Sequence, residues 1–342
     1  MDRSPDTRGA LRPDRSPGGR AMRFPIGRRG FAKLAAGSGV VAFGAAGRGL
    51  LLPWFDFARA ASAQELVEPE IRTSTDGLLD TTLTCSVKDV QVAGRPSLMS
   101  VYEGSSPGPT LRVKPGERLR INLINRLGSH PEGLSPESPF ICSPVSPTGH
   151  ALGEHGSTCD TNLHLHGMHV SPEGNSDNIF MSIRDGESFQ YEYDIPANHP
   201  GGLYWYHPHR HGTVSNQVFT GLAGPLIIEG DIDAVPGIAG VPERLLVLQA
   251  TQFTPDGKSA QGNATGLGST DNGATQLKKY VRLVNGQLNP TMTLRPGETQ
   301  RWRILNAAAN VTYCVQLDGH KLHQISKDGN ALNETWARDS IV

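Results

Sequence analysis

From about residue 79 onward, apolar and polar residues alternate in short runs that glycine and proline separate. Successive residues of a strand point to opposite faces, so such runs place apolar side chains together on one face. Many short runs bounded by turn residues predict an all-β protein of the sandwich type. The predicted strands are residues 81–84, 87–92, 111–113, 119–124, 189–195 and 226–228.

A turn between two of these strands recurs later in the chain. The tripeptide Pro-Gly-Glu stands at residues 115–117 and again at residues 296–298, each time before a strand-like run. An internal repeat of this sort indicates two copies of one β-sandwich. The pattern therefore predicts a first domain over residues 79–231 and a second over residues 240–342.

The N-terminal part has a different composition. Residues 1–27 are rich in Arg, Pro, Asp and Gly and have no apolar period, which predicts a disordered extension. Residues 28–63 begin with Arg28-Arg29, continue in a Gly/Ala-rich apolar run and end in small residues before Gln64. This arrangement predicts a twin-arginine export signal and a periplasmic or secreted protein. The run contains Arg48 and is shorter than the ~20 apolar residues of a span, so no stable membrane span is expected.

Charge and known short motifs exclude several function classes. The net charge is -1, and the part after the export signal has no basic cluster, so the sequence gives no reason to expect nucleic-acid binding. Neither a glycine-rich phosphate loop nor a serine elbow is present.

The four cysteines are Cys85, Cys142, Cys159 and Cys314, and none stands in a C-x-x-C motif. In an oxidising compartment cysteines can pair. Cys142 and Cys159 bracket a loop rich in Pro, Gly and Ser that would otherwise be long and structureless, so a disulfide is expected between them. Cys85 and Cys314 lie in strand-like runs and are expected to be buried thiols.

The candidate chemistry lies in two H-x-H pairs, His164 with His166 and His207 with His209. Chance predicts about 0.4 such matches in a chain of this histidine content. Both imidazoles of a pair project from one face of a strand, roughly 6 to 7 Å apart, which suits neighbouring ions in a cluster better than one shared ion. Imidazole ligands without thiolate suit copper or zinc. Structural histidines are the alternative.

Each pair is followed by a glycine and further pattern, at residues 166–172 and 218–228. These segments resemble the first two copper motifs of multicopper oxidases, the three-domain cupredoxin enzymes that include laccases and bilirubin oxidases. Residues 107–117 resemble the entry to the first cupredoxin domain, and residues 243–307 resemble the second domain, which carries no copper ligands. The resemblance implies tandem Greek-key cupredoxin β-sandwiches with copper as the cofactor.

The resemblance also implies residue roles. His164 matches the ligand of the mononuclear (type 2) copper, and His166, His207 and His209 match ligands of the paired (type 3) coppers. Asp177 matches an acidic residue that helps to deliver protons to bound dioxygen; the alternative is a loop Asp that caps its own turn. By contrast, His169 and His211 match no ligand, and His320 and His323 in the second half are expected to be structural.

The matched pattern stops inside a strand near Val342, so the second sandwich is expected to be incomplete. In the family a third domain supplies the remaining cluster histidines and a blue copper site. The expected function is therefore that of the N-terminal portion of an oxidase that uses dioxygen and an unknown reducing substrate, inactive without that domain. The alternatives are a non-catalytic exported copper-binding protein and a structural cupredoxin-fold protein of the cell envelope, although the retained histidines disfavour the latter.

Overall fold

The computed structural model describes residues 64–92, 95–134, 138–145, 156–254, 260–261 and 280–342. The predicted extension at 1–27 and export signal at 28–63 lie outside these residues. Among the described residues, no helix has the length and apolar character needed to cross a membrane.

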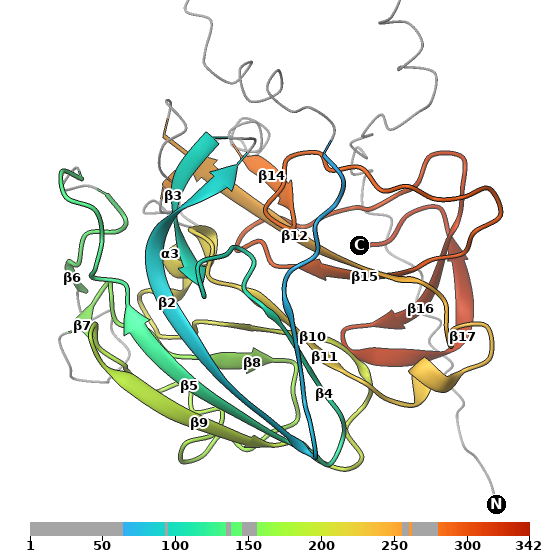
Figure 1. Ribbon diagram of the computed structural model, residues 1–342, viewed down its shortest axis with the longest axis horizontal. Helices are drawn as coiled ribbons and strands as arrows, with labels where there is room; N and C mark the ends of the chain where they lie inside the picture. Colours follow the sequence, from blue (N-terminus) through green and yellow to red (C-terminus); the bar gives the residue numbers. More distant parts are fainter. Residues whose placement is uncertain (1–63, 93–94, 135–137, 146–155, 255–259, 262–279) are drawn as a thin grey trace, which may run out of the picture.

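The strands form two groups of sheets, one in the left and lower part of Figure 1 and one in the right-hand part. The first group, called the first unit here, contains a five-stranded sheet and a four-stranded sheet. The five-stranded sheet runs in the order β1 (Ile71–Thr73), β4 (Thr110–Val113), β11 (Gly224–Ile228), β10 (Gly202–His207) and β8 (His164–His166). The four-stranded sheet runs in the order β3 (Arg95–Tyr102), β2 (Leu78–Val92), β5 (Arg118–Arg126) and β9 (Ser188–Asp194). A short pair, β6 (Pro144–Val145) and β7 (Gly156–Ser157), completes this unit.

The two larger sheets share one hydrophobic core, as the alternating pattern predicts. In β5, Leu119, Ile121 and Leu123 are buried while their neighbours are partly or fully exposed. These residues belong to the same core cluster as Leu165 of β8 and Leu226 of β11, in the other sheet. The core thereby fixes which face of β8 points inward and which face carries its histidines.

The second unit comprises β12 (Glu243–Phe253), β13 (Ala260–Gln261), β14 (Val281–Val284) and β15 (Arg301–Asn306), together with the hairpin of β16 (Leu322–Lys327) and β17 (Asn330–Arg338). β12 pairs in parallel with β15. The β16–β17 sheet is largely exposed, and Trp336 on it keeps 41% of its surface accessible.

The Pro-Gly-Glu repeat corresponds to one turn built twice. Gly116 has φ +83° and Gly297 has φ +81°, a backbone conformation that glycine adopts at little cost. In both turns the Glu side chain accepts a hydrogen bond from a backbone amide three residues earlier, at 2.7 Å for Glu117 and 3.0 Å for Glu298. Each turn leads into a strand that pairs in parallel with an earlier one, β5 with β2 and β15 with β12.

The first residues of the described chain join the two units. Leu66 N donates to Thr291 O at 2.8 Å, and Thr291 N donates to Gln64 O at 2.7 Å. Thr291 belongs to the second unit, between β14 and β15. A few residues later β1 pairs in parallel with β4 of the first unit. The segment 64–73 therefore crosses from one unit to the other.

Charged side chains also bridge the units. Arg112 of β4 pairs with Glu229 at 3.1 Å and with Glu243, at the start of β12, at 2.7 Å. Arg303 of β15 pairs with the same Glu243 at 2.7 Å and with Asp233 at 2.9 Å. Because each carboxylate has an arginine partner, this partly buried network holds β4, β12 and β15 in a fixed arrangement.

The cysteines follow the predictions with one exception. Cys142 and Cys159 form a disulfide, and their Cα atoms lie 5.2 Å apart. Cys85 is fully buried, and burial raises the pKa of its thiol to about 12. The expectation of a buried Cys314 was wrong: this residue is exposed and lies outside any strand, next to Val315, which forms only an isolated bridge with Ile341.

The described residues contain one α-helix, α3 (Val214–Phe219), and a 3-10 turn, η1 (Asp231–Ala234). The all-β prediction is confirmed, although the helix was not expected. The runs predicted at 81–84 and 87–92 are one 15-residue strand, β2, because no turn interrupts its pairing with β3 and β5.

Candidate metal centre

The two H-x-H pairs meet because β8 and β10 are neighbours in one antiparallel sheet. His164 lies directly opposite His207, and His166 lies opposite Trp205. Opposed residues of an antiparallel pair project to the same face. Leu165 and Tyr206, which alternate with them, are completely buried in the core. The period of two therefore gathers the histidines on the opposite face, as the sequence predicts. Figure 1 shows β8 beside β10 at the centre of the first unit.

The imidazole rings lie close together. The ring centroid of His164 lies 5.7 Å from that of His166, 5.3 Å from that of His207 and 4.9 Å from that of His209. The ligand nitrogens of His164, His166 and His207 all lie within 4.8 Å of one another. Three imidazoles at this spacing form a group that could hold a metal ion, and His209 extends the group by one more ring.

Asp177 orients His164. Its Oδ2 lies 2.9 Å from His164 Nδ1, and its Oδ1 accepts the Leu165 amide at 3.0 Å. A carboxylate only accepts hydrogen bonds, so Nδ1 carries the proton and Nε2 keeps its lone pair free for a metal. Carboxylate–histidine pairs of this kind accompany metal-binding histidines in many proteins.

Asp177 reaches this position through a loop rather than a strand. The Asp177 amide donates to Ser171 O at 2.9 Å, and this backbone hydrogen bond fixes the loop. The Asp177 side chain points to β8, where it contacts His164 and Leu165. The simpler expectation of an Asp that only caps its own turn therefore does not describe the contacts observed.

His207 is the most buried of the group. Its Nδ1 donates to the Pro208 carbonyl at 2.7 Å, which leaves Nε2 as an acceptor 3.2 Å from His166 Nδ1. Burial lowers the pKa of His207 to about 3, and the neighbouring imidazoles act in the same direction. Burial and the charge of His164 also lower the pKa of His166. The surroundings of both rings therefore favour the neutral form, which is the form that binds metal.

His209 lies beyond the end of β10 and is held by Asn162. The His209 amide donates to Asn162 Oδ1 at 2.6 Å, and Asn162 Nδ2 donates to Ile179 O at 2.7 Å. His209 Nδ1 is buried without a hydrogen-bond partner among the described residues. Burial lowers the pKa of this ring as well. A buried, unpartnered nitrogen beside three other imidazoles is a group that a metal would satisfy.

Helix α3 holds the segment that precedes β8 through hydrogen bonds. The buried Gln217 of this helix accepts a hydrogen bond from the Thr161 hydroxyl at Oε1, at 2.9 Å. Its Nε2 donates a hydrogen bond to the Asp160 carbonyl at 2.8 Å. Thr161 and Asp160 lie immediately before the histidines of β8. The helix thus fixes the backbone that leads into β8.

The other histidines lie outside the group. His169 is exposed, and its amide donates to Nε2 of the buried His199 at 3.0 Å. His211 is exposed, with its ring centroid 6.0 Å from that of His209. His320 and His323 are exposed in the second unit and belong to no metal-binding group found among the described residues.

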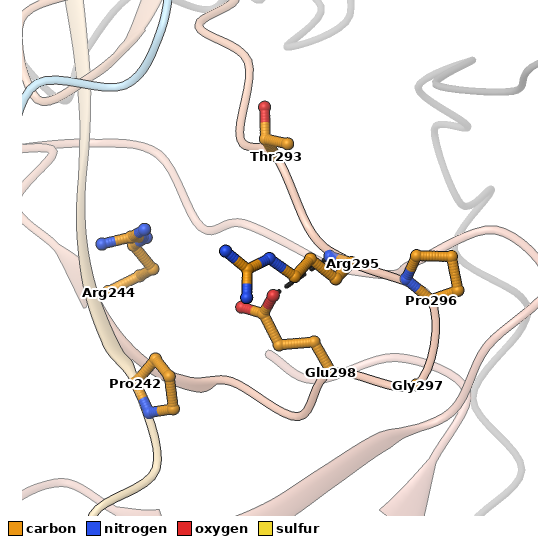
Figure 2. Close-up of a pocket in the computed structure, with 7 residues that line it drawn as sticks. All are labelled: Pro242, Arg244, Thr293, Arg295, Pro296, Gly297 and Glu298. Carbon is orange, nitrogen blue, oxygen red and sulfur yellow. Dashed lines mark hydrogen bonds between the residues drawn. The ribbon is translucent and has the colours of Figure 1, made fainter.

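A separate surface cleft lies in the second unit, and Figure 2 shows its lining. The lining residues are Pro242, Arg244, Thr293, Arg295, Pro296, Gly297 and Glu298. Glu298 accepts the Arg295 amide, and Arg244 pairs with Glu68 at 3.4 Å. The cleft contains neither histidine nor cysteine, so it offers no ligands of the kind that copper prefers.

Comparison with known proteins agrees with the geometry. Two family models, both described as multicopper oxidase, match residues 156–232 and 243–341. The multicopper oxidase MmcO of Mycobacterium tuberculosis is 26% identical over 328 residues, which cover 88% of this chain and 54% of that protein. A laccase of Bacillus stratosphericus is 29% identical over 255 residues, which cover 69% of this chain and 47% of that protein. The chain spans about half the length of these curated relatives.

The structure of a multicopper oxidase from Campylobacter jejuni superimposes with a TM-score of 0.60 at 23% identity, covering 83% of this chain and 52% of that one. This likeness shows the cupredoxin fold. The chain belongs to the multicopper oxidase family. Copper is the cofactor of this family, and the group around His164 fits it: neutral imidazoles, one of them oriented by a carboxylate and one with a buried unpartnered nitrogen.

Two residues at this centre were not found from the sequence. Asn162 is completely buried and holds the His209 amide, and Tyr204 packs near the glycine that follows His166. Both act through contacts with residues far away in the chain, which no local pattern marks. For Asn162 the residue type gave one hint, because the side-chain amide of an Asn needs several hydrogen-bond partners wherever it is buried.

Proposed function

We propose that this chain forms one side of a copper centre that serves the reduction of dioxygen to water, coupled to the one-electron oxidation of a second substrate. The observation that carries the proposal is the grouping of the ligand nitrogens of His164, His166 and His207 within 4.8 Å. Membership of the family supports copper as the metal and oxidase chemistry as its use.

In this proposal each histidine has its own role. His164 binds the mononuclear (type 2) copper through the nitrogen that Asp177 leaves free. His166, His207 and His209 bind the paired (type 3) coppers. This division follows the family pattern. His207 Nε2 and His166 Nδ1 lie 3.2 Å apart, close enough for both nitrogens to take part in one copper site.

Asp177 is proposed to do two things. It holds the tautomer of His164, which rests on the 2.9 Å contact between its Oδ2 and His164 Nδ1. Because reducing dioxygen consumes protons, a carboxylate beside the centre can also pass protons inward from solvent. Its side chain is 12% exposed, so it is close to the surface yet still within the centre.

Two cupredoxin domains, at residues 79–231 and 240–342, are proposed to carry this function in an exported protein that is periplasmic or secreted. In the family the remaining cluster ligands and an electron-accepting copper come from a further domain, and the four imidazoles of this chain do not replace them. We therefore propose that the chain acts as part of a larger oxidase, whose reducing substrate that further part selects.

Copper binding by the full chain tests the proposal. The wild-type protein and a His164→Ala/His166→Ala variant are titrated with Cu²⁺ against a competing chelator, and bound copper is counted after dialysis. His320→Ala is the matched control, because His320 is an exposed histidine of the second unit. The expected result is loss of most binding in the double variant and wild-type binding in the control. Equal binding by all three proteins would reject the proposed centre and would leave the fold assignment intact.

A second candidate, a copper-binding protein without oxidase function, uses the same residues. Joining this chain to a third domain taken from a multicopper oxidase distinguishes the two. Oxidation of phenols or aromatic amines that depends on His164 and His166 supports the oxidase. Copper binding that never yields oxygen consumption supports the non-catalytic protein instead.

A further inference from the structure

Strand β10 presents its side chains alternately to the two faces of its sheet. Tyr204 and Tyr206 are buried in the core that the two sheets of the first unit share. Leu203, Trp205 and His207 alternate with them and therefore project from the opposite face. That face carries the histidine group at the end of the strand, so Trp205 lies beside the group without belonging to it.

Trp205 also contacts the second unit. Trp205 and Leu203 are half-buried and pack against an apolar cluster that is separate from the main core. The members of this cluster are Ala223, Leu245, Val247, Leu305 and Ala307. All but Ala223 lie in β12, in β15 or directly after β15. In Figure 1 β15 lies next to β10. The indole of Trp205 is therefore part of the contact between the two units.

The same indole stacks on two rings of the histidine group. Its ring centroid lies 4.1 Å from that of His207 and 5.0 Å from that of His166, with interplanar angles of 31° and 30°. His166 is the residue opposite Trp205 in the β8–β10 pair, and His207 is two residues further along β10, so the strand register puts all three on one face. Stacked rings of this kind attract each other beyond the burial of their surface.

His166 depends on this contact for its position. Its side chain is exposed, and among the described residues its aromatic neighbours are His164, His207 and Trp205. Only Trp205 is not itself a proposed ligand. An exposed side chain without a fixed neighbour samples several rotamers and loses that freedom when it binds a metal. A ring that is already held by Trp205 has less freedom to lose.

We propose that Trp205 is a positioning residue of the metal centre: it fixes the rings of His166 and His207 and links their position to the packing of the second unit. The second unit carries no proposed copper ligand, and its apolar cluster acts on the centre through this indole. The effect on copper binding rests on the proposed function. The positioning of the two rings does not require a metal, so it is tested separately.

Nuclear magnetic resonance relaxation of the histidine ring carbons in the metal-free full chain measures the positioning directly. Trp205→Leu keeps an apolar side chain toward the second unit but removes the stacking ring. We expect the order parameters of the His166 and His207 rings to fall in this variant. The ring of His199 should keep its value, because both of its nitrogens have hydrogen-bond partners. Wild-type order at His166 and His207 in Trp205→Leu would overturn the proposal.

Copper affinity by chelator competition and the electron paramagnetic resonance spectrum of bound Cu²⁺ measure the consequence for the centre. We expect the dissociation constant to rise about tenfold in Trp205→Leu and about twofold in Trp205→Phe, which keeps a smaller ring, within the range of one aromatic contact. The spectrum should change with it, whereas a role only in joining the units would leave the spectrum as in the wild type. Trp302→Leu is the matched control, because Trp302 is a half-buried tryptophan of β15 whose indole donates to Gln300. This control should match the wild type.

Two buried leucines of the second unit test the link to its packing. Leu305 belongs to the cluster against which Trp205 packs, whereas Leu283 belongs to the main core. Leu305→Ala should raise the dissociation constant about twofold, and only while Trp205 is present, because the effect passes through the indole. Leu283→Ala should leave it unchanged. Val247→Ala, a smaller truncation in the same cluster, replaces Leu305→Ala if that variant does not fold.

The outcomes separate this inference from the proposed function. If the wild type binds copper and Trp205→Leu binds it equally well with the same spectrum, the inference is wrong and the proposed centre stands. An effect of Leu305→Ala that is the same with and without Trp205 would overturn the link to the second unit. If the wild type binds no copper but Trp205→Leu still loosens the rings of His166 and His207, the proposed function fails and the positioning role stands.

Discussion

Asp177 Oδ2 and His164 Nδ1 lie 2.9 Å apart, and the same carboxylate holds the backbone amide of Leu165. One side chain therefore fixes both the ring and the strand of the first proposed ligand. Its contact partners are twelve and thirteen residues earlier in the chain, so the loop between them sets the geometry of the centre.

Replacing Asp177 with Asn should weaken copper binding by about 10- to 100-fold, the range seen when carboxylate partners of metal-binding histidines are removed. The Asn amide can donate to His164 Nδ1, which moves the ring proton to Nε2 and blocks the nitrogen that would bind the metal. Chelator competition on both proteins measures the change. Asp339→Asn, which removes an exposed carboxylate paired with Lys321, should bind copper like the wild type.

The metal-free chain should lose stability as the pH falls below about 6.5. Burial lowers the pKa of His207 to about 3 in the folded protein, from the ordinary histidine value of 6.5. Between these values the unfolded chain takes up a proton at this ring and the folded chain does not, so unfolding becomes easier. Above pH 6.5 both states are neutral and the full stability is present.

Urea unfolding of the metal-free protein at pH 7.5 and at pH 5 measures this effect. Other groups also titrate in this range, so the comparison is made with His207→Gln. The loss of stability between the two pH values should be smaller in that variant. An identical loss in both proteins would show that His207 takes up its proton equally in the folded and unfolded states.

Much of the first unit follows from its sequence. In β5 the alternation of Leu119, Ile121 and Leu123 sets the core face, and in β8 the same period sets the two histidines apart from Leu165. A local period was sufficient because each strand has one face in the core and the other turned away. The convergence of the two histidine pairs followed from that period and from the family resemblance together.

What the sequence did not predict depends on distant contacts or on weak local signals. Helix α3 has six residues, no side-chain cap and no charged residue in its first or last turn, so none of the usual helix signals marks it. The prediction of a buried Cys314 was wrong because a strand-like run of residues does not show whether other parts of the chain will cover it. In the sequence Tyr204 has the pattern of an ordinary strand aromatic, and only its hydrogen bond to the Gly329 carbonyl, 125 residues away, shows that it also contacts the second unit.

Removing the disulfide should lower the free energy of unfolding by about 3 kcal/mol, as the loop-entropy model gives for a loop of this size. Cys142 and Cys159 are 17 residues apart. The test is urea unfolding of the Cys142→Ser/Cys159→Ser protein. Cys314→Ser changes an exposed residue and should leave the unfolding midpoint in place. A double variant as stable as that control would contradict the prediction.

The copper-loaded chain should show no intense blue absorption. A blue site needs one thiolate and two histidines. Cys142 and Cys159 are bonded to each other, and the buried Cys85 has its Sγ 3.4 Å from the Ile124 carbonyl rather than near a histidine. A visible spectrum of the copper-loaded protein tests this. An intense band that disappeared in Cys314→Ser would reveal a thiolate site at that residue.

The most direct measurement is the position of bound copper itself. Crystals of the full chain soaked in Cu²⁺ and measured at the copper absorption edge give an anomalous map in which only the metal stands out. The account predicts the strongest peak within bonding distance of ring nitrogens of His164, His166 and His207, at the group those nitrogens form within 4.8 Å. A strongest peak at the exposed His320 or His323, with none between β8 and β10, would contradict it.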